Sequence, residues 1–155
     1  MSGETLNGLL KNGQKILEQS GIREAGLDAW LLLEYITGKS RAYYFAHGDE
    51  GVTEETACRY QELIRKRAEH IPLQHLTHQA FFMGHEFYVD KNVLVPRQDT
   101  ETLVESALEC MKAVKNPYIL DMCTGSGCIL ISILKERADA HGTGVDLSDE
   151  ALKVA

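Results

Sequence analysis

The 155-residue sequence has few of the residues that form disulfides or interrupt helices and strands, with four cysteines and three prolines. The cysteines form no Cys-x-x-Cys pair and no disulfide-like spacing, which predicts free thiols in a reducing compartment. The amino terminus lacks the apolar core of a signal peptide, and no apolar run approaches the ~20 residues that span a membrane. These absences predict a cytoplasmic protein without membrane contact.

An excess of positive charge is also missing. The net charge is −7, and acidic side chains outnumber basic ones in residues 1–90 and in residues 91–155. Proteins that bind nucleic acid usually carry clustered lysine and arginine. We therefore expect no direct contact with nucleic acid. The clustered histidines (His70, His75, His78 and His85) match no common zinc spacing, so we also expect no metal site.

The first pattern along the chain is a helical periodicity of apolar residues. Apolar residues recur every three or four positions over 4–19 and 24–37, and a short aromatic helix is predicted over 40–48. Thr53 fits the N-cap of a further helix that ends near His70. These segments predict a small helical domain at residues 1–75. The basic run at 65–67 is expected to be a solvated helix end, where cations suit the helix dipole.

The pattern changes after Pro72. Aromatic and β-branched residues on both sides of Met83-Gly84-His85 predict a β-hairpin within a linker at residues 76–97. A short strand is expected at 92–95, followed by a turn at Pro96 and a helix from Asp99 or Thr100. This helix is expected to bury five apolar side chains, namely Leu103, Val104, Ala107, Leu108 and Met111.

A strand and helix alternation begins at Tyr118. We expect a strand at 118–122, a loop at 123–127, a helix at 128–138, a strand at 142–146, and a helix that opens at Ser148 and continues to the last residue. Alternating β and α segments are typical of a parallel sheet. The sequence therefore predicts an α/β fold, with this domain occupying residues 98–155.

The loop has the residues of a ligand-binding turn. In "ILDMCTGSGCILIS", residues 119–132, a strand ends at Asp121, glycines follow, and an apolar helix begins. Such a turn lets a nucleotide-like ligand approach bare backbone. Asp146 ends the next strand 19 residues after Gly127, close to the ~20-residue spacing of a ribose-binding carboxylate.

Three ligand classes compete for this loop. A phosphate-binding P-loop needs a lysine after the last glycine, and none is present. A dinucleotide fold needs a third glycine where Leu130 stands, so it is poorly supported. S-adenosylmethionine (SAM), a nucleoside cofactor without phosphates, remains. An ordinary tight turn between strand and helix is the alternative without a ligand.

Several segments resemble one family. "ILDMCTGSGCI" is similar to the first SAM-binding motif of class I methyltransferases, and "NVLVPRQDTETLVE" narrows the match to the HemK/PrmC family of release factor glutamine methyltransferases. "RKRAEHIPLQHLTHQAFFMGHEFYV" resembles the linker hairpin of that family, and "DAWLLLEYITG" a helix of its amino-terminal domain. The resemblance implies a small N-terminal helical domain, a β-hairpin linker and the first part of a Rossmann-like, class I SAM-dependent methyltransferase sheet.

The same resemblance assigns roles to individual residues. It implies that SAM is the cofactor, that Asp121 steadies the loop, and that Asp146 binds the ribose hydroxyls. Arg97, Thr100 and Glu101 are expected near the pocket, and Cys123 occupies the first glycine position of the general motif. The loop residues implied to wrap the methionine end of SAM are Cys123, Thr124, Gly125, Ser126 and Gly127.

The implied reaction is methyl transfer from SAM to the side-chain amide of the glutamine in the Gly-Gly-Gln motif of class I peptide-chain release factors, which act in translation termination. The family orients that amide with an Asn-Pro-Pro-Tyr motif after the fourth strand. This sequence has no such motif, and Asn116-Pro117-Tyr118 is interpreted as a turn before the first strand. We therefore expect no catalytic residue in this chain and interpret it as truncated. The alternative is a non-catalytic chain that serves only as a protein-docking or cofactor-binding module.

Overall fold

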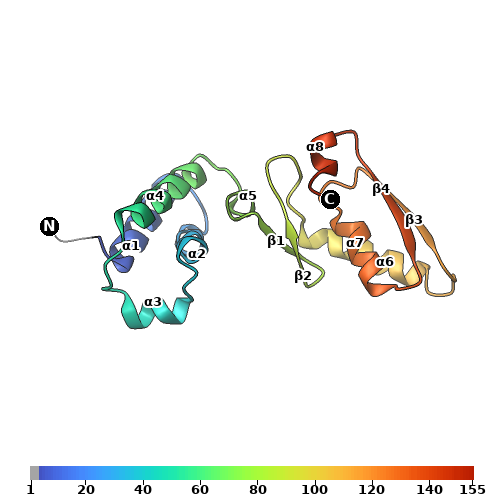
Figure 1. The fold of residues 1–155 in the computed structure, drawn as a ribbon, viewed down its shortest axis with the longest axis horizontal. Helices are drawn as coiled ribbons and strands as arrows, with labels where there is room; N and C mark the ends of the chain where they lie inside the picture. Colours follow the sequence, from blue (N-terminus) through green and yellow to red (C-terminus); the bar gives the residue numbers. More distant parts are fainter. Residues whose placement is uncertain (1–3) are drawn as a thin grey trace. The chain divides into compact units, whose positions relative to one another are not determined.

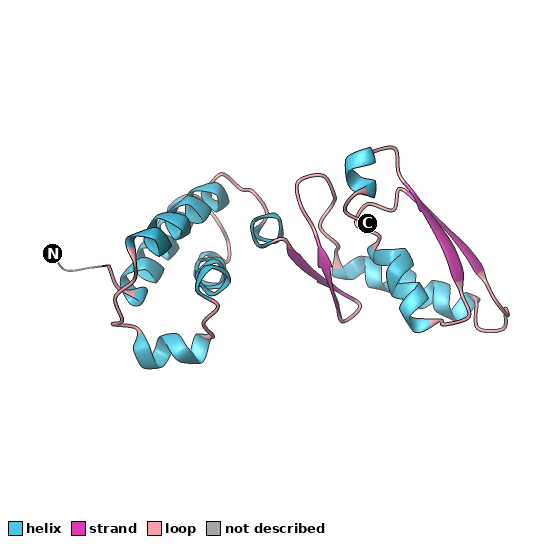
Figure 2. Ribbon diagram, in the orientation of Figure 1, coloured by secondary structure: helices cyan, strands magenta, loops and turns pink. Residues whose placement is uncertain are grey.

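A computed structural model describes residues 4–155, which form two compact units divided between Thr77 and His78. The first unit is entirely helical, and the second combines helices with two small sheets (Figures 1 and 2). The prediction of a mixed α/β chain with an amino-terminal helical domain, a hairpin and a parallel sheet is confirmed.

The helical unit contains every helix that periodicity predicts, together with a short extra one. In chain order its helices are α1 (Leu6–Gln19), α2 (Ala25–Thr37), α3 (Arg41–His47), α4 (Glu54–Ala68) and the short α5 (Leu73–Thr77). Local sequence explains where they begin and end. The Thr53 hydroxyl accepts a hydrogen bond from the Thr56 N–H at 3.2 Å and so caps α4. Gly38 follows α2 with a φ of 65°, a conformation that glycine adopts without strain.

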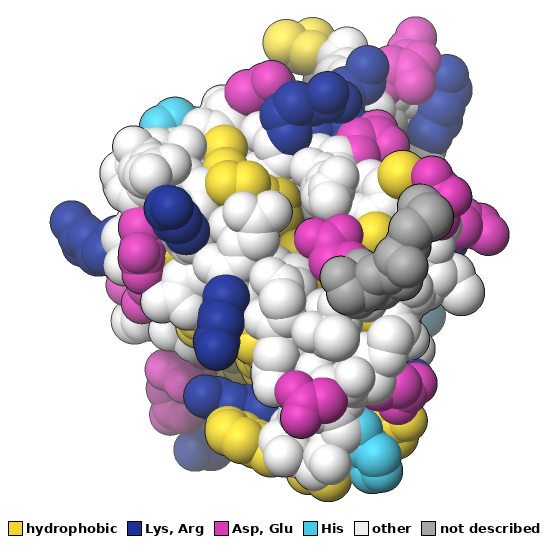
Figure 3. Space-filling view, turned by 90° about the vertical axis from the view of Figure 1, so that its left-hand side faces the viewer, with side chains coloured by type: hydrophobic (Ala, Val, Ile, Leu, Met, Phe, Trp, Pro, Cys, Tyr) yellow, Lys and Arg dark blue, Asp and Glu magenta, His cyan; other side chains and the backbone are white. Residues whose placement is uncertain are grey.

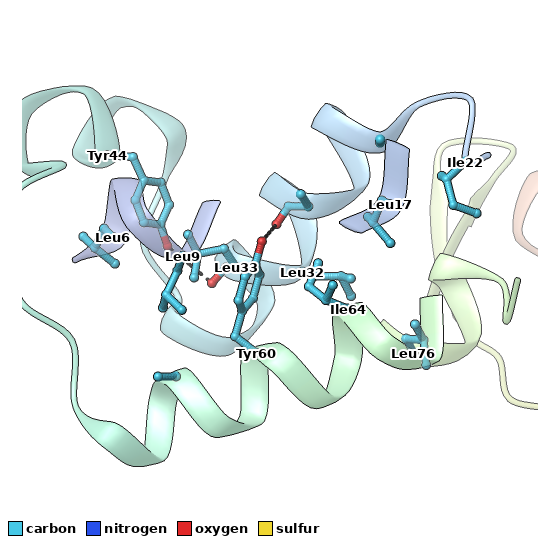
Figure 4. Close-up of a cluster of buried hydrophobic side chains, with 13 residues drawn as sticks. Leu6, Leu9, Leu17, Ile22, Leu32, Leu33, Tyr44, Tyr60, Ile64 and Leu76 are labelled. Atoms are coloured by element: carbon cyan, nitrogen blue, oxygen red, sulfur yellow. Dashed lines mark hydrogen bonds between the residues drawn. The ribbon is translucent and has the colours of Figure 1, made fainter. Parts of the chain in front are cut away.

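The core of this unit lies between α1, α2 and α4 (Figure 4). Leu9, Leu32 and Leu33 are fully buried within it. Tyr60 of α4 is also buried, and its hydroxyl donates to the Ala29 carbonyl of α2 at 3.0 Å. Burial raises the pKa of the Tyr60 phenol, so it stays protonated and can act as this donor. Its ring lies against Gly13, where any Cβ would collide with the phenol.

An ion pair inside the helical unit corrects one expectation about the basic run at 65–67. Arg67 is not a solvated helix end, because its Nε donates to Asp28 Oδ2 at 2.7 Å and its Nη1 donates to the Ile71 carbonyl at 3.1 Å. Both charged side chains are largely buried. Lys66, by contrast, remains solvated and pairs with Glu62 one turn earlier. Sequence reasoning missed Arg67 because its partner is distant in the chain.

The second unit opens with the predicted hairpin. Strand β1 (Gln79–Phe82) pairs antiparallel with β2 (His85–Tyr88) through the two-residue turn Met83-Gly84, whose φ angles of 50° and 72° are both left-handed. Such angles match the twist of a tight hairpin. Phe82 and Phe87 are buried, with ring centroids 6.3 Å apart, and pack with Val104, Cys128 and Ile133.

The strand predicted at 92–95 is absent. The Asp90 carboxylate accepts hydrogen bonds from both the backbone N–H and the side-chain amide of Asn92, which closes a turn. Because this side-chain bonding fixes a turn, the segment does not form a strand despite the β-propensity of the valines that follow. A 3₁₀ turn (Gln98–Thr100) then leads into α6 (Glu101–Cys110), close to the predicted start. Leu103 is 55% exposed, so its predicted burial is wrong; only Val104 of this helix is fully buried.

The predicted strand–loop–helix–strand segment is confirmed, with small shifts. It comprises β3 (Tyr118–Met122), α7 (Cys128–Glu136), β4 (His141–Val145) and α8 (Asp149–Leu152). The strands are parallel, with Asp121 opposite Gly144. Helix α8 ends at Leu152 in a turn, so the expectation that it continues to the last residue is wrong.

The two faces of this sheet differ. Ile119 of β3 packs beneath α7 in the apolar cluster of the unit. On the opposite face, Tyr118, Leu120 and Met122 are 70%, 59% and 65% exposed. Three large apolar side chains of one strand therefore lie open to solvent. Across residues 4–155, no helix has both the length and the apolar character required to cross a lipid bilayer.

Candidate functional site

The loop at 123–127 joins the carboxyl end of β3 to α7 and alternates between left-handed and ordinary backbone. Its φ angles are 62° at Cys123, 56° at Gly125 and 74° at Gly127. Glycine adopts this region freely, whereas a residue with a Cβ pays about 1–2 kcal/mol. Cys123 therefore adopts the backbone conformation of the glycine that the general motif has at this position, and it carries the strain that a glycine would avoid.

Thr124 ties the loop to both strands. Its backbone N–H donates to the Val145 carbonyl of β4 at 3.0 Å, and its hydroxyl donates to Asp121 Oδ2 of β3 at 2.8 Å. The side chain is buried, and it fits there because the residue beneath it is Gly144, where a Cβ would lie 2.8 Å from the hydroxyl oxygen. Asp121 thus holds the loop through Thr124.

Asp146 holds the same loop from the other side. Its Oδ2 accepts a hydrogen bond from the Gly125 N–H at 3.0 Å, and its Oδ1 accepts one from the Ser148 N–H at 3.0 Å. These backbone donors, that of Ser148 first, lower the pKa of the Asp146 carboxyl, so it is ionised at neutral pH. Each carboxylate oxygen can accept a second hydrogen bond. Asp146 therefore retains capacity to accept bonds from a ligand.

The two cysteines that flank the loop differ in environment. Cys123 is exposed, whereas Cys128 is buried at the start of α7. Burial raises the pKa of the Cys128 thiol, which stays neutral and lies in the apolar cluster that contains Phe82 and Phe87. Cys128 is therefore a packing thiol, whereas Cys123 is open to solvent.

A cavity of about 140 Å³ lies beside the loop. On one side it is lined by residues 123–126, and on the other by Leu94–Arg97 and Thr100. Arg97 and Thr100 thus lie at the loop, as the sequence predicts. Glu101 does not line this cavity; its Oε1 accepts a hydrogen bond from the Met83 N–H at 2.7 Å and anchors the hairpin turn. Sequence reasoning missed this role because the partner is a backbone group in another element.

Two other candidate motifs have structural roles. Asn116 precedes β3 with a φ of 48°, and its N–H donates to Asp139 Oδ2 at 3.0 Å, which is the geometry of a turn. His78 has left-handed backbone, donates from Nδ1 to the Val89 carbonyl at 3.2 Å, and stacks on Tyr88. Among residues 4–155, no three histidine, cysteine, aspartate or glutamate side chains are arranged to hold a metal ion.

The sequence is similar to known proteins over most of its length. Residues 8–77 match the family described as PrmC N-terminal domain. The release factor glutamine methyltransferase of Leptospira interrogans is 38% identical over 148 residues, which is 95% of this chain and 52% of that protein. That of Deinococcus radiodurans is 35% identical over 150 residues, 97% of this chain and 54% of that protein.

A third relative, the release factor glutamine methyltransferase of Burkholderia pseudomallei, is 40% identical over 129 residues, 83% of this chain and 45% of that protein. The chain spans about half the length of the curated relatives it matches. The first two matches cover 95% and 97% of this chain, so they extend over the hairpin and the glycine loop as well as most of the helical unit. Residues 8–77 therefore form a PrmC N-terminal domain, in a chain that over most of its length is similar to release factor glutamine methyltransferases.

Proposed function

We propose that this chain forms part of a SAM-dependent methyltransferase that modifies the glutamine side-chain amide in the Gly-Gly-Gln motif of class I release factors in the cytoplasm. Residues 1–75 would dock the protein substrate, residues 76–97 would form the linker, and residues 98–155 would be the amino-terminal part of the methyltransferase domain. The observation that carries this proposal is the glycine loop held between Asp121 and Asp146 at the carboxyl ends of two parallel strands.

The open backbone of the loop and the carboxylate of Asp146 are compatible with bound SAM. A Cβ at Gly125 would meet no atom within 4 Å, so open space adjoins the backbone there. The backbone of residues 123–127 would hold the methionine end, and the ionised Asp146 would accept hydrogen bonds from the ribose hydroxyls. When bound, SAM supplies an electrophilic methyl group. The cavity of about 140 Å³ is smaller than the ~300–1,000 Å³ of typical ligand pockets, so these residues would hold only part of the cofactor.

Methyl transfer also requires that the glutamine amide, which accepts the methyl group, is held in a fixed orientation. An amide nitrogen is a poor nucleophile because its lone pair is delocalised into the carbonyl. An enzyme helps chiefly by positioning that nitrogen toward the methyl group with fixed hydrogen-bond acceptors. In the family this positioning is assigned to an Asn-Pro-Pro-Tyr motif, which residues 1–155 do not contain. We therefore assign binding roles, and no catalytic role, to the residues of this chain.

Replacement of Asp146 tests the proposal. Asp146→Ala should weaken SAM binding at least about tenfold, because the charge-assisted bonds to the ribose and the bond that holds Gly125 are both lost. Calorimetric titration of SAM into the 155-residue chain measures this. Glu136→Ala, which removes an exposed carboxylate at the end of α7, is the matched control and should leave the affinity unchanged. Equal SAM affinity of Asp146→Ala and the unmodified chain would contradict the assigned cofactor site.

A non-catalytic docking or cofactor-binding module is the second candidate. The observation that favours it is the lack of an Asn-Pro-Pro-Tyr motif within residues 1–155. Methyl transfer by a longer protein that contains both this chain and the motif would support the methyltransferase. A complete lack of transfer by such a protein, with SAM bound and a release factor present, would support the non-catalytic module.

A further inference from the structure

The helical unit has a cavity of about 320 Å³ that no cofactor role explains. It lies between α1, α2 and α3, and its walls include Leu10, Trp30, Arg41, Tyr44 and Phe45. Phe45 is 83% exposed, which is unusual for a phenylalanine in a small helical domain. In Figure 3, hydrophobic side chains reach the surface at the lower edge of this end of the molecule, at the height of α3 in Figure 1, next to basic side chains.

Arg41 is held over the aromatic rings instead of being paired with an acid. Its guanidinium carbon lies 5.3 Å from the centroid of Trp30 and 5.9 Å from that of Phe45. In the described part of the chain, no carboxylate forms an ion pair with Arg41. None of the residues that line the cavity is acidic. Stacking on the rings pre-organises the planar guanidinium for a carboxylate from elsewhere.

Trp30 adds an unpaired donor to the same wall. Its indole N–H is buried and has no acceptor among residues 4–155. A buried donor without an acceptor costs about 1–3 kcal/mol, so the packing of the helical unit is not fully satisfied at this wall of the cavity.

A second cavity of the helical unit, about 590 Å³, carries both charges in its wall. Arg67 is paired there with Asp28 at 2.7 Å, and the wall also holds Glu24 together with Arg23. The cavity at Arg41, by contrast, has a basic side chain and no acidic one in its wall.

We propose that this cavity docks an acidic and apolar segment of the protein substrate, with a carboxylate on Arg41 and an apolar side chain against Trp30 and Phe45. The identity of the partner as the substrate rests on the proposed function, whereas the chemistry of the site rests on the contacts above. Because the whole chain carries a net charge of −7, attraction of an acidic segment is local to this cavity and short in range.

Trp30 is the single tryptophan of the chain, so its indole N–H gives one assignable NMR signal. The signal is followed in the 155-residue chain during titration with a short, acetylated and amidated peptide of alternating glutamate and leucine. The matched peptide replaces every glutamate with glutamine. The acidic peptide should shift the signal to saturation, and the neutral peptide should bind at least about tenfold more weakly, because one charge-assisted contact is lost.

Variants separate the charge from the apolar contact. Arg41→Gln should bind the acidic peptide only as well as the neutral one, and Phe45→Ala should weaken both. Arg59→Gln, at an exposed position of α4 outside the cavity wall, should behave like the unmodified chain. An unchanged amide spectrum checks that each variant is folded. Equal affinity for the two peptides, or unchanged binding of the acidic peptide by Arg41→Gln, would overturn the proposal.

A second measurement tests the partner. Binding of a class I release factor should be weakened at least about fivefold by Arg41→Gln and not by Arg59→Gln, with SAM affinity the same in all three chains. Unchanged release factor binding by Arg41→Gln would overturn the assignment of this cavity to the substrate. A lack of release factor binding by every chain, including the unmodified one, would instead refute the proposed substrate, and the peptide titration would still decide the chemistry of the cavity.

Discussion

At the scale of single residues, Cys123 is a position in the glycine loop where the residue type and the backbone angle conflict. Its φ of 62° lies in the region that glycine adopts without cost, and the neighbouring left-handed positions of the loop are glycines. The sequence predicted a glycine-like position here, because the general motif has glycine in this place. It could not predict the angle itself, which the bonds of Thr124 and Gly125 to the two strands impose.

Cys123→Gly should therefore stabilise the loop. Relief of the left-handed strain contributes about 1–2 kcal/mol, and the greater backbone freedom of glycine in the unfolded chain offsets about 0.5–1 kcal/mol of it. We expect the free energy of opening of β3 and β4 to rise by up to about 1.5 kcal/mol, measured by amide hydrogen exchange. Cys123→Ala removes the thiol but keeps the Cβ, so it should give no gain. Equal protection in the two variants would show that the loop is not strained at this residue.

At the scale of elements, the segments with complete local signals were predictable, and those decided by distant partners were not. The bounds of β3 follow from its apolar residues and the glycines after it, and α4 begins where Thr53 provides a cap. The false strand at 92–95 came from valines that look extended, whereas the Asp90 side chain closes a turn there. Leu103 fits a helical apolar stripe but faces solvent, because α6 packs against the core through Val104, Ala107 and Leu108 instead.

We expect the connection from α6 to β3 to lose stability in acid. Arg137 donates to the carbonyls of Met111 and Val114 and pairs with Asp139 at 2.9 Å. The Arg137 guanidinium, with the Asn116 N–H, lowers the pKa of Asp139 from 3.8 to about 2. Since the folded-state pKa is depressed, the stabilisation is complete above about pH 4 and is lost as the pH falls from about 4 to about 2.

Acid titration followed by amide exchange at residues 111–118 measures this loss. Asp139→Asn should remove the pH dependence in that window, because no carboxyl remains there to titrate. Glu109→Gln, at an exposed position of α6, should retain it. An Asp139→Asn variant that loses protection between pH 4 and pH 2 as the unmodified chain does would show that another group is responsible.

The open face of the β3–β4 sheet predicts self-association of the isolated chain. Tyr118, Leu120 and Met122 form one exposed apolar row, and exposed apolar strands promote pairing between chains. Leu120→Thr keeps the β-propensity and removes part of the apolar surface, so it should reduce light scattering at a given protein concentration. Leu103→Thr changes a similarly exposed leucine outside the sheet and should have little effect. Equal scattering of the two variants would show that the sheet face is not the associating surface.

At the scale of the whole molecule, the described residues form two units with different features. The helical unit has its own core, formed only by residues between Leu6 and Leu76. The second unit has a loop held between two carboxylates, and the sequence contains no Asn-Pro-Pro-Tyr motif. The sequence predicted both parts because their signals are local. It could not reveal the cavity at Arg41, since that cavity forms only when three helices pack together.

The 155-residue chain should accordingly bind SAM weakly and transfer no detectable methyl group to a release factor. Weak binding follows because a cavity of about 140 Å³ encloses only part of the ligand and leaves its polar groups in contact with water. A lack of transfer is expected because residues 1–155 contain no Asn-Pro-Pro-Tyr motif to orient the amide nitrogen, and orientation provides most of the rate enhancement in such a step. Mass spectrometry of a release factor incubated with SAM measures the transfer. A longer protein that contains this chain and the Asn-Pro-Pro-Tyr motif is the positive control, and methylation of the glutamine by residues 1–155 alone would show that the acceptor site lies within this chain.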